Sequence, residues 1–190
     1  MTTRPLGRCL AAAALAFAAI SGAQAAGYTS LNTDDSRIVF AYSQMGVGME
    51  GSFKNLEAKS FNFDTERPET AQVVIEIPLI NVDAGYDEAN DELEKSEWLD
   101  TERHPFARFT SSQVTALGDN RYEVTGQLSI KGRDKEVSVP FEFTEEGDAG
   151  LFLGSFTLQR DDFGIGEGQW ADFGIVANDI QIKFHFVANP

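Results

Sequence analysis

Two histidines are the first residues to examine for catalysis, because imidazole is the commonest general acid–base group in enzymes. His104 and His185 lie far apart in the sequence, and neither belongs to a Gly-x-Ser-x-Gly, glycine-rich phosphate-binding or His-Glu-x-x-His motif. Spacing alone does not exclude a triad assembled around either histidine. Two single histidines, with Cys9 as the only cysteine, also give little support for zinc. We expect no enzyme activity, no cofactor and no metal site.

Charged and aromatic side chains offer three further candidates for chemistry. Residues 87–102 are strongly acidic but lack the spaced Asp-x-Asp-x-Asp-Gly loop of a calcium site, so a solvated helix face is favoured. Arg160 precedes Asp161 and Asp162, which leaves two roles open: contact with a polar headgroup or a local ion pair. Trp170 follows a glycine-containing stretch and would cap a cavity mouth or plug the interior.

The amino terminus has the features of a cleavable secretory signal. Arg4 and Arg8 precede an apolar run from Leu10 to Ile20, and Ala23-Gln24-Ala25 provides a small-x-small cleavage site. The run of 11 residues is too short to cross a bilayer, which needs roughly 20. Cleavage after Ala25 would leave 165 residues without cysteine, enough for a core that needs no disulfide. We expect a signal peptide at 1–25, one domain at 26–190, and a periplasmic or secreted location.

The acidic balance of the chain limits its partners. Without Arg4 and Arg8, 13 basic side chains stand against 30 acidic ones, a formal charge of −17. Phosphate backbones and anionic membrane surfaces repel such a protein, so we expect no nucleic-acid partner and no stable membrane insertion. The charge is better explained by solubility than by a specific cationic partner. The oligomeric state stays open, with a homodimer among the possibilities.

Apolar and polar residues alternate with period two through most of the chain. This alternation is typical of strands with one buried and one solvated face. Strands are predicted around Ile38–Tyr42, Gly48–Asn55, Ala58–Phe63, Val73–Leu79, Phe106–Val114, Tyr122–Ile130, Val137–Phe143, Phe152–Leu158 and Ile180–Phe186.

One segment breaks the alternation and predicts a short helix near Asp87–Ser96, packed beside the sheet by Leu93, Trp98 and Leu99. Turn residues rich in glycine, aspartate and asparagine separate the other runs, as in antiparallel meanders. With so few helical residues, the apolar strand faces must bury against one another, in a sandwich or in a closed barrel. An eight-stranded barrel is just wide enough to be filled by side chains or to hold one small ligand.

Three residues at strand positions bear on whether the interior is filled. Gly126 and Gly154 fall on inward positions, where a missing side chain leaves room for a ligand or a neighbouring backbone, or only relieves strain at a bend. Pro140 lies inside a predicted strand and is expected to mark a bulge or a strand end. The pattern alone does not decide between an open and a filled barrel.

Several segments, in order and over about 150 residues, together resemble the YceI-like, lipid- or polyisoprenoid-binding family. They are Ser36–Phe40, Gly51–Phe53, Asp91–Asp100, His104–Ser111, Val124–Gly132 and Gln159–Gly166. Two positions depart from the family pattern. His104 stands where an aromatic residue, often tyrosine, usually precedes the proline, and Ser129 replaces the threonine of the Gly-x-Leu-Thr-Ile-Lys-Gly hairpin.

The resemblance implies an all-β, eight-stranded antiparallel lipocalin-like barrel with one short helix, and a carrier of an isoprenoid lipid or quinone-like amphiphile. The ligand-binding candidates are Phe40, Phe53, Phe109, Phe141, Phe156, Arg160, Trp170 and Phe184. The alternative is an exported stress or interaction protein whose filled barrel works through its acidic surface.

Overall fold

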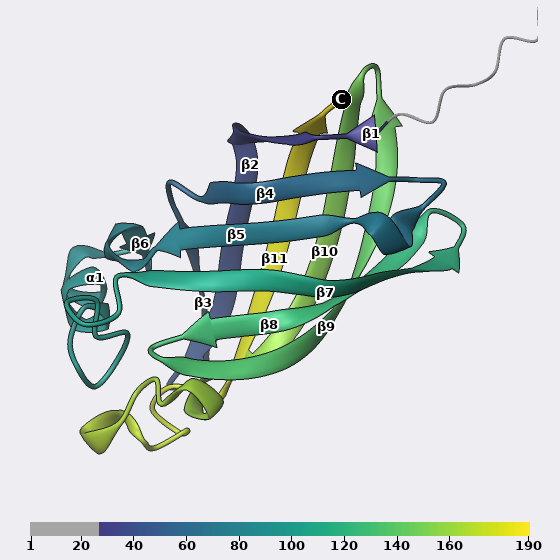
Figure 1. Cartoon of the computed structure of the whole chain (residues 1–190). Coiled ribbons are helices and arrows are strands. Elements are labelled where there is room, and N and C mark those ends of the chain that lie inside the picture. The colour runs from purple at the N-terminus through teal and green to yellow at the C-terminus, as the bar shows by residue number, and fades with distance from the viewer. Residues whose placement is uncertain (1–26) are drawn as a thin grey trace, which may run out of the picture.

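The computed structural model describes residues 27–190, so the signal peptide expected at 1–25 lies outside the described residues. Eleven strands form one antiparallel sheet, which curls into a barrel (Figure 1). The strands are β1 (Gly27–Tyr28), β2 (Ser30–Gln44), β3 (Val47–Phe53), β4 (Glu57–Asp64), β5 (Gln72–Pro78), β6 (Val82–Asp83), β7 (Phe106–Gly118), β8 (Arg121–Ile130), β9 (Arg133–Glu146), β10 (Ala149–Gln159) and β11 (Asp179–Asn189).

The all-β barrel is as predicted, and each of the nine predicted runs coincides with a strand. The count of eight is wrong, because nine strands have seven or more residues and β1 and β6 have two residues each. Strands of two residues are too short to show an alternation, so no pattern predicted them.

The strand order is β1-β4-β5-β7-β8-β9-β10-β11-β2-β3-β6. In Figure 1, β4, β5, β7 and β8 cross in front of β2, β11 and β10, and the long strand β9 curves from one layer to the other. Tyr28 pairs with Phe63 of β4, while Ser30 pairs with Asn189 of β11. The first described residues therefore connect the two layers at the end of the barrel where the chain terminates.

Glycines on the inward rows accommodate the rings of neighbouring strands. A Cβ placed on Gly154 would lie 2.3 Å from Cζ of Phe184, its direct cross-strand partner. A Cβ on Gly126 would lie 2.6 Å from Cζ of Phe109, and Gly51 faces Phe40 in the same way. Of the alternatives for Gly126 and Gly154, room for a ligand is wrong, because phenylalanine rings cover both positions, whereas a neighbouring backbone does lie close to each, at the carbonyl oxygens of Thr110 and Pro140. This pairing is a known device for stabilising glycines in strands.

Pro140 neither bulges nor ends its strand. The β8–β9 ladder runs through it without a shift, from Arg121–Glu142 to Ile130–Arg133. The β9–β10 ladder, by contrast, has six pairs and stops at Phe141–Gly154. The next rung would join Pro140 to Ser155, and a proline has no N–H to donate there. Pro140 therefore ends the pairing on one side of β9 only.

The helix and two loops form a cap at one end of the barrel. Helix α1 (Asp87–Leu93) begins at the predicted residue and ends three residues before the predicted end, where a series of turns follows. Trp98 and Leu99 in these turns are buried. A second segment, residues 160–178, contains the short helices η3 (Arg160–Phe163) and η4 (Gly168–Trp170). We call residues 84–104 and 160–178 the cap. Within residues 27–190, no helix is long and apolar enough to span a membrane.

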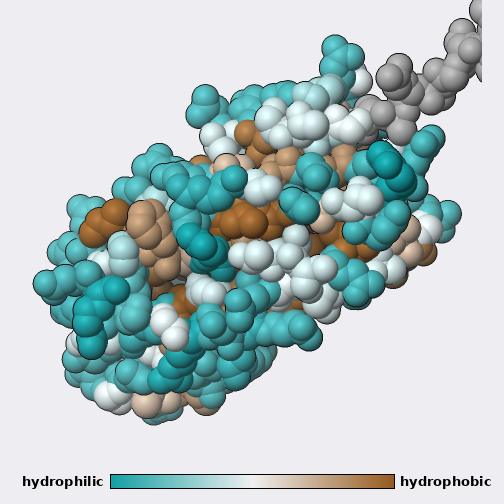
Figure 2. All heavy atoms as spheres, viewed as in Figure 1, coloured by the Kyte–Doolittle hydropathy of each residue, from teal (hydrophilic) through white to brown (hydrophobic). Residues whose placement is uncertain are grey.

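The outer face of the sheet is mostly hydrophilic, with hydrophobic residues visible near its middle (Figure 2). Glu76 of β5 is the buried acid of this face, with 7% of its surface exposed. Nε of Arg108 donates to Oε1 of Glu76 at 2.8 Å, and Nζ of Lys59 lies 3.1 Å from Oε2. The hydrogen bonds from Arg108 lower the pKa of Glu76; burial acts in the opposite direction, and Lys59 adds to the lowering. Glu76 thus joins β4, β5 and β7 through charge.

Gly154→Ala should destabilise the barrel by about 1–3 kcal/mol, the usual cost of overpacking a filled site. The new methyl would press on both the Phe184 ring and the carbonyl oxygen of Pro140, which lies 2.7 Å from the position that the Cβ would take. Gly48→Ala is the matched control, since nothing lies within 4 Å of its Cβ position. Urea unfolding of the two variants measures the difference. Equal stabilities would show that the ring does not depend on the glycine.

Glu76→Gln should flatten the loss of stability in acid. Because the pKa of Glu76 is lowered on folding, its contribution is complete above its ordinary value of 4.5 and disappears as the pH falls through the lower folded value. The difference in free energy of unfolding between wild type and variant should therefore be constant above about pH 5 and shrink progressively as the pH falls below 4.5. Glu136→Gln, a change of an exposed strand glutamate, is the control. A difference between wild type and Glu76→Gln that does not shrink at all in acid would contradict the assignment.

Candidate ligand-binding site

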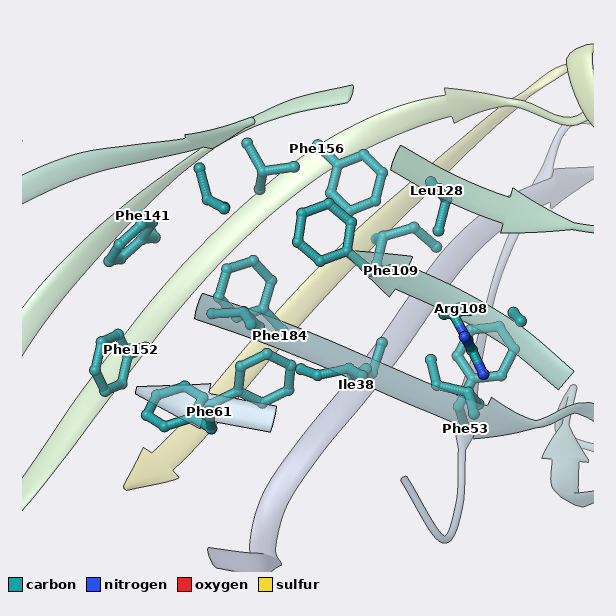
Figure 3. Close-up of a pocket in the computed structure, with 18 of the residues that line it drawn as sticks. Ile38, Phe53, Phe61, Arg108, Phe109, Leu128, Phe141, Phe152, Phe156 and Phe184 are labelled. Atoms are coloured by element: carbon teal, nitrogen blue, oxygen red, sulfur yellow. The ribbon is translucent and has the colours of Figure 1, made fainter. Parts of the chain in front are cut away.

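The barrel encloses an apolar space, here called the inner cavity, of about 160 Å³ (Figure 3). Its lining is aliphatic and aromatic apart from Arg108, whose guanidinium pairs with Glu76. Five of the predicted ligand-binding residues line it: Phe53, Phe109, Phe141, Phe156 and Phe184. An apolar cavity of about 150 Å³ is known to stay dry and to take up a benzene-sized molecule. The inner cavity therefore suits a hydrocarbon and not a hydrated group.

Packed aromatic rings close the inner cavity at the end remote from the cap. Phe63 lies at the centre of this cluster, with its ring centroid 5.2 Å from that of Tyr122, 5.3 Å from Phe143 and 5.0 Å from Phe152. Tyr28 packs against Phe143 with centroids 5.3 Å apart. All five residues are buried. Edge-to-face contacts at these distances are favourable, so this end forms a stable plug.

A second space, the outer cavity, lies between the barrel and the cap and has a volume of about 310 Å³. The remaining predicted residues, Phe40, Arg160 and Trp170, line it together with Phe53. Its lining also includes Tyr42, Gln44, Tyr86, Glu88 and Glu92. The outer cavity thus offers hydrogen-bonding groups that the inner cavity lacks, and its volume reaches the range of small-molecule sites.

The two cavities meet at a ring of apolar side chains. The residues that line both are Phe53, Ala107, Ile130, Leu158 and Ile182. They come from β3, β7, β8, β10 and β11, so the ring surrounds the boundary between the two cavities from most sides. An elongated ligand would pass through this ring, with one part in each cavity.

Side-chain hydrogen bonds fasten the cap over the outer cavity. The Tyr86 hydroxyl donates to Oε1 of Gln44 at 3.2 Å, and Nε1 of Trp170 donates to Oε1 of Glu92 at 2.9 Å. Hydrogen bonding from Lys95 lowers the pKa of Glu92, burial opposes it, and the bond from Trp170 lowers it further. Glu92 is therefore held as a carboxylate. Trp170 lies in the cap at the outer cavity, where it ties the second cap segment to α1.

Arg160 organises the second cap segment from within. It is 1% exposed, and its guanidinium donates to five backbone carbonyls. The acceptors are the carbonyl oxygens of Ile165, Gly166, Trp170, Val176 and Ala177, at 2.7–3.1 Å. The guanidinium also lies 5.7 Å from the Trp98 ring centroid and 5.1 Å from that of Phe173. Burial lowers the pKa of Arg160, and the ring of carbonyl dipoles favours the charged form.

The local ion pair considered for Arg160 is not formed. Within residues 27–190, neither Asp161 nor Asp162 contacts its guanidinium, and Oδ1 of Asp162 instead lies 2.8 Å from Nζ of Lys135. Contact between Arg160 and a headgroup stays a prediction, and such contact would compete with a backbone carbonyl. No three side chains of His, Cys, Asp or Glu in the described part of the chain gather as a candidate metal site.

All eight predicted residues line at least one of the two cavities, and their contact with a ligand stays a prediction. Sequence reasoning missed the ring between the cavities and the part of the cap that lines the outer one. Ile130, Leu158 and Ile182 were visible as inward positions, but nothing distinguished them from ordinary core residues. Ala107 carried no signal, because a small residue in a strand looks the same in a packed core and beside a passage.

Arg160→Met should lower the free energy of unfolding by about 3 kcal/mol or more, because five buried or partly buried carbonyls lose their donor and the loss at a buried one costs about 1–3 kcal/mol before relaxation. Arg160→Lys should recover less than half, since an ammonium has three donors on one atom and no planar fork. Urea unfolding and amide exchange of residues 160–178 measure both effects. Full recovery by lysine would show that charge alone holds the segment.

Known proteins of one family are similar to this chain over most of its length. A model of the YceI-like domain matches residues 30–188. A UPF0312 protein of Pseudomonas syringae pv. tomato is 31% identical over 193 residues, covering 94% of this chain and 100% of that protein. A UPF0312 protein of Azotobacter vinelandii is 32% identical over 171 residues, covering 84% of this chain and 88% of its own.

Solved structures share the barrel. BcnA of Burkholderia cenocepacia has a TM-score of 0.81 at 34% identity, with 84% of this chain and 100% of BcnA covered. A polyisoprenoid-binding domain of Saccharophagus degradans has a TM-score of 0.62 at 12% identity, with 87% and 99% covered, and supports the fold alone. The resemblance seen in the sequence is confirmed: this chain belongs to the YceI-like family.

Proposed function

We propose that the protein is an exported, periplasmic carrier that holds the apolar chain of an isoprenoid lipid or quinone-like amphiphile in its barrel. The observation that carries this proposal is the pair of adjacent cavities, one lined by apolar side chains and one edged by polar groups, which share five lining residues. Membership of the YceI-like family supports it, as does the polyisoprenoid-binding domain among the similar folds. The predicted signal peptide is the support for export.

The two cavities suggest how an amphiphile would lie. Its tail would occupy the inner cavity, which presents no free hydrogen-bonding side chain, and would end at the plug around Phe63. Its polar head would lie in the outer cavity near Tyr42, Gln44 and Tyr86. A tail of several isoprene units would need both cavities, because the inner one matches a single benzene-sized group.

The energetics suit a carrier better than an irreversible store. Each CH₂ group removed from water contributes about 0.8 kcal/mol. A tail that leaves a membrane is already buried, however, so its transfer into the barrel is nearly balanced. The rate of exchange between membrane and barrel then depends more on the route of entry than on the affinity of the barrel for the tail.

Native mass spectrometry of the mature protein, purified gently from its own export compartment, tests the proposal. We expect a discrete added mass that extracts into organic solvent. A bare protein that also fails to bind added quinones and polyprenols would favour the alternative, a scaffold acting through its acidic surface.

Ala107→Phe should block the passage between the cavities and abolish, or reduce at least tenfold, binding of a long polyprenol. Ala107 is buried and lines both cavities, so a phenyl ring there would fill the passage. Ala116→Phe makes the same change at an exposed position of the same strand and is the control. Equilibrium binding by fluorescence competition, with stability checked by urea unfolding, compares the two. Equal affinity would show that the ligand does not cross the ring.

A further inference from the structure

A seam in the barrel wall lies between β9 and β10. The two strands pair over six rungs and separate at Phe141–Gly154, yet β9 continues back to Arg133 and β10 continues on to Gln159. The neighbouring ladders, β8–β9 and β10–β11, each run for ten pairs. We define the seam as the unpaired facing edges of residues 133–140 and 155–159.

The seam borders the inner cavity. Val139 of β9 and Phe156 and Leu158 of β10 lie on its two edges, and all three line that cavity. Phe156 is only partly buried, whereas the preceding inward side chain of its strand, Phe152, is buried. In Figure 3, Phe156, Phe109 and Leu128 are drawn in the same part of the cavity. An apolar side chain, and no backbone hydrogen bond, therefore separates the cavity from the outside along this line.

The two ends of the barrel are closed by stronger contacts than the seam. The aromatic plug around Phe63 fills one end. At the other end, the cap is fastened by the bonds from Tyr86 and Trp170 and by the five bonds of Arg160. At the two edges of the sheet, β1 pairs with the last two residues of β4, and β6 pairs with the last two residues of β3.

Charged side chains of β9 join the end of the seam that lies nearer the cap to the cap itself. Lys135 of β9 lies 2.8 Å from Oδ1 of Asp162, and Arg133 lies 3.2 Å from Oε1 of Glu167. Side chains of both pairs are 44–53% exposed. Exposed pairs of this kind contribute little and are screened by salt. These two pairs therefore add little to the closure of the seam.

We infer that the β9–β10 seam is the lateral portal through which an apolar chain enters and leaves the inner cavity, with Phe156 as its gate and the Lys135–Asp162 pair as its clasp. This inference rests on the proposed carrier function. A chain that slides in sideways does not have to draw its polar end past the aromatic plug. It also leaves the cap in place, so the buried Arg160 keeps its five acceptors throughout exchange.

Cross-linking the seam tests the portal. The chain from residue 27 onward contains no cysteine, so introduced pairs react alone. Ser138→Cys/Thr157→Cys places two exposed thiols across the seam, where a short reversible bis-thiol linker joins them. Glu142→Cys/Leu153→Cys, on a rung that is already paired, is the matched control. The probe is N-phenyl-1-naphthylamine, a neutral apolar fluorophore, and stopped-flow fluorescence measures its uptake and its release to phosphatidylcholine vesicles.

We expect the seam link to slow uptake and release at least tenfold with unchanged equilibrium binding, and cleavage of the linker to restore the rates. The control link should leave both rates unchanged. Equal rates in the two linked variants, with binding intact, would overturn the portal and leave the carrier function standing. Failure of every form, the unmodified protein included, to bind the probe or a polyprenol would overturn both.

A second variant needs no linker. Lys135→Glu replaces the clasp with a repulsion from Asp162 and should speed uptake several-fold, while Arg67→Glu makes the same charge change in an exposed turn far along the chain and should not. High salt should speed uptake by the wild type toward the rate of Lys135→Glu. A rate that is insensitive to both changes would overturn the clasp.

Discussion

The open interior of this barrel depends on phenylalanine rings that lie over glycines of neighbouring strands. Phe184 covers Gly154, Phe109 covers Gly126 and Phe40 covers Gly51, each within a distance that excludes any side chain on the glycine. A ring that lies against the wall does not reach the centre of the barrel. Larger residues at the glycines would push the rings inward and fill the space. The glycine–phenylalanine pairs therefore give the barrel wall an apolar inner surface and keep the cavity open.

Closure of the capped end follows from a different constraint, the need to satisfy a buried guanidinium. Arg160 has no carboxylate partner within the described residues, and its five hydrogen bonds fix the path of residues 165–177. That path places Trp170 where its indole reaches Glu92 of α1. Because a buried cation without acceptors is very costly, the segment keeps its shape or the arginine leaves the interior. The cap is thus rigid where it meets the outer cavity.

Period-two alternation was enough to predict the nine longer strands, because each has one buried and one solvated face. Together with the family resemblance, it placed all eight predicted residues on the cavity walls, but an inward position is all that such a pattern can identify. It did not reveal the contents of the interior. A glycine at an inward strand position, such as Gly154, predicts an unfilled space. Only the cross-strand register shows that the Phe184 ring occupies it. The role of Arg160 stayed open beside two aspartates, because its acceptors are backbone carbonyls, which no sequence pattern displays.

Pro140 shows how one residue can serve both the curvature of the barrel and its opening. The strand that carries it must leave one layer and join the other, and it pairs with β8 along the stretch where it separates from β10. Without an N–H at the point of departure, Pro140 has no donor to leave unpaired when β10 separates. A residue with an N–H would favour one more rung and move the separation toward the cap. The proline therefore fixes where the seam begins, beside Phe156 and the apolar lining of the inner cavity.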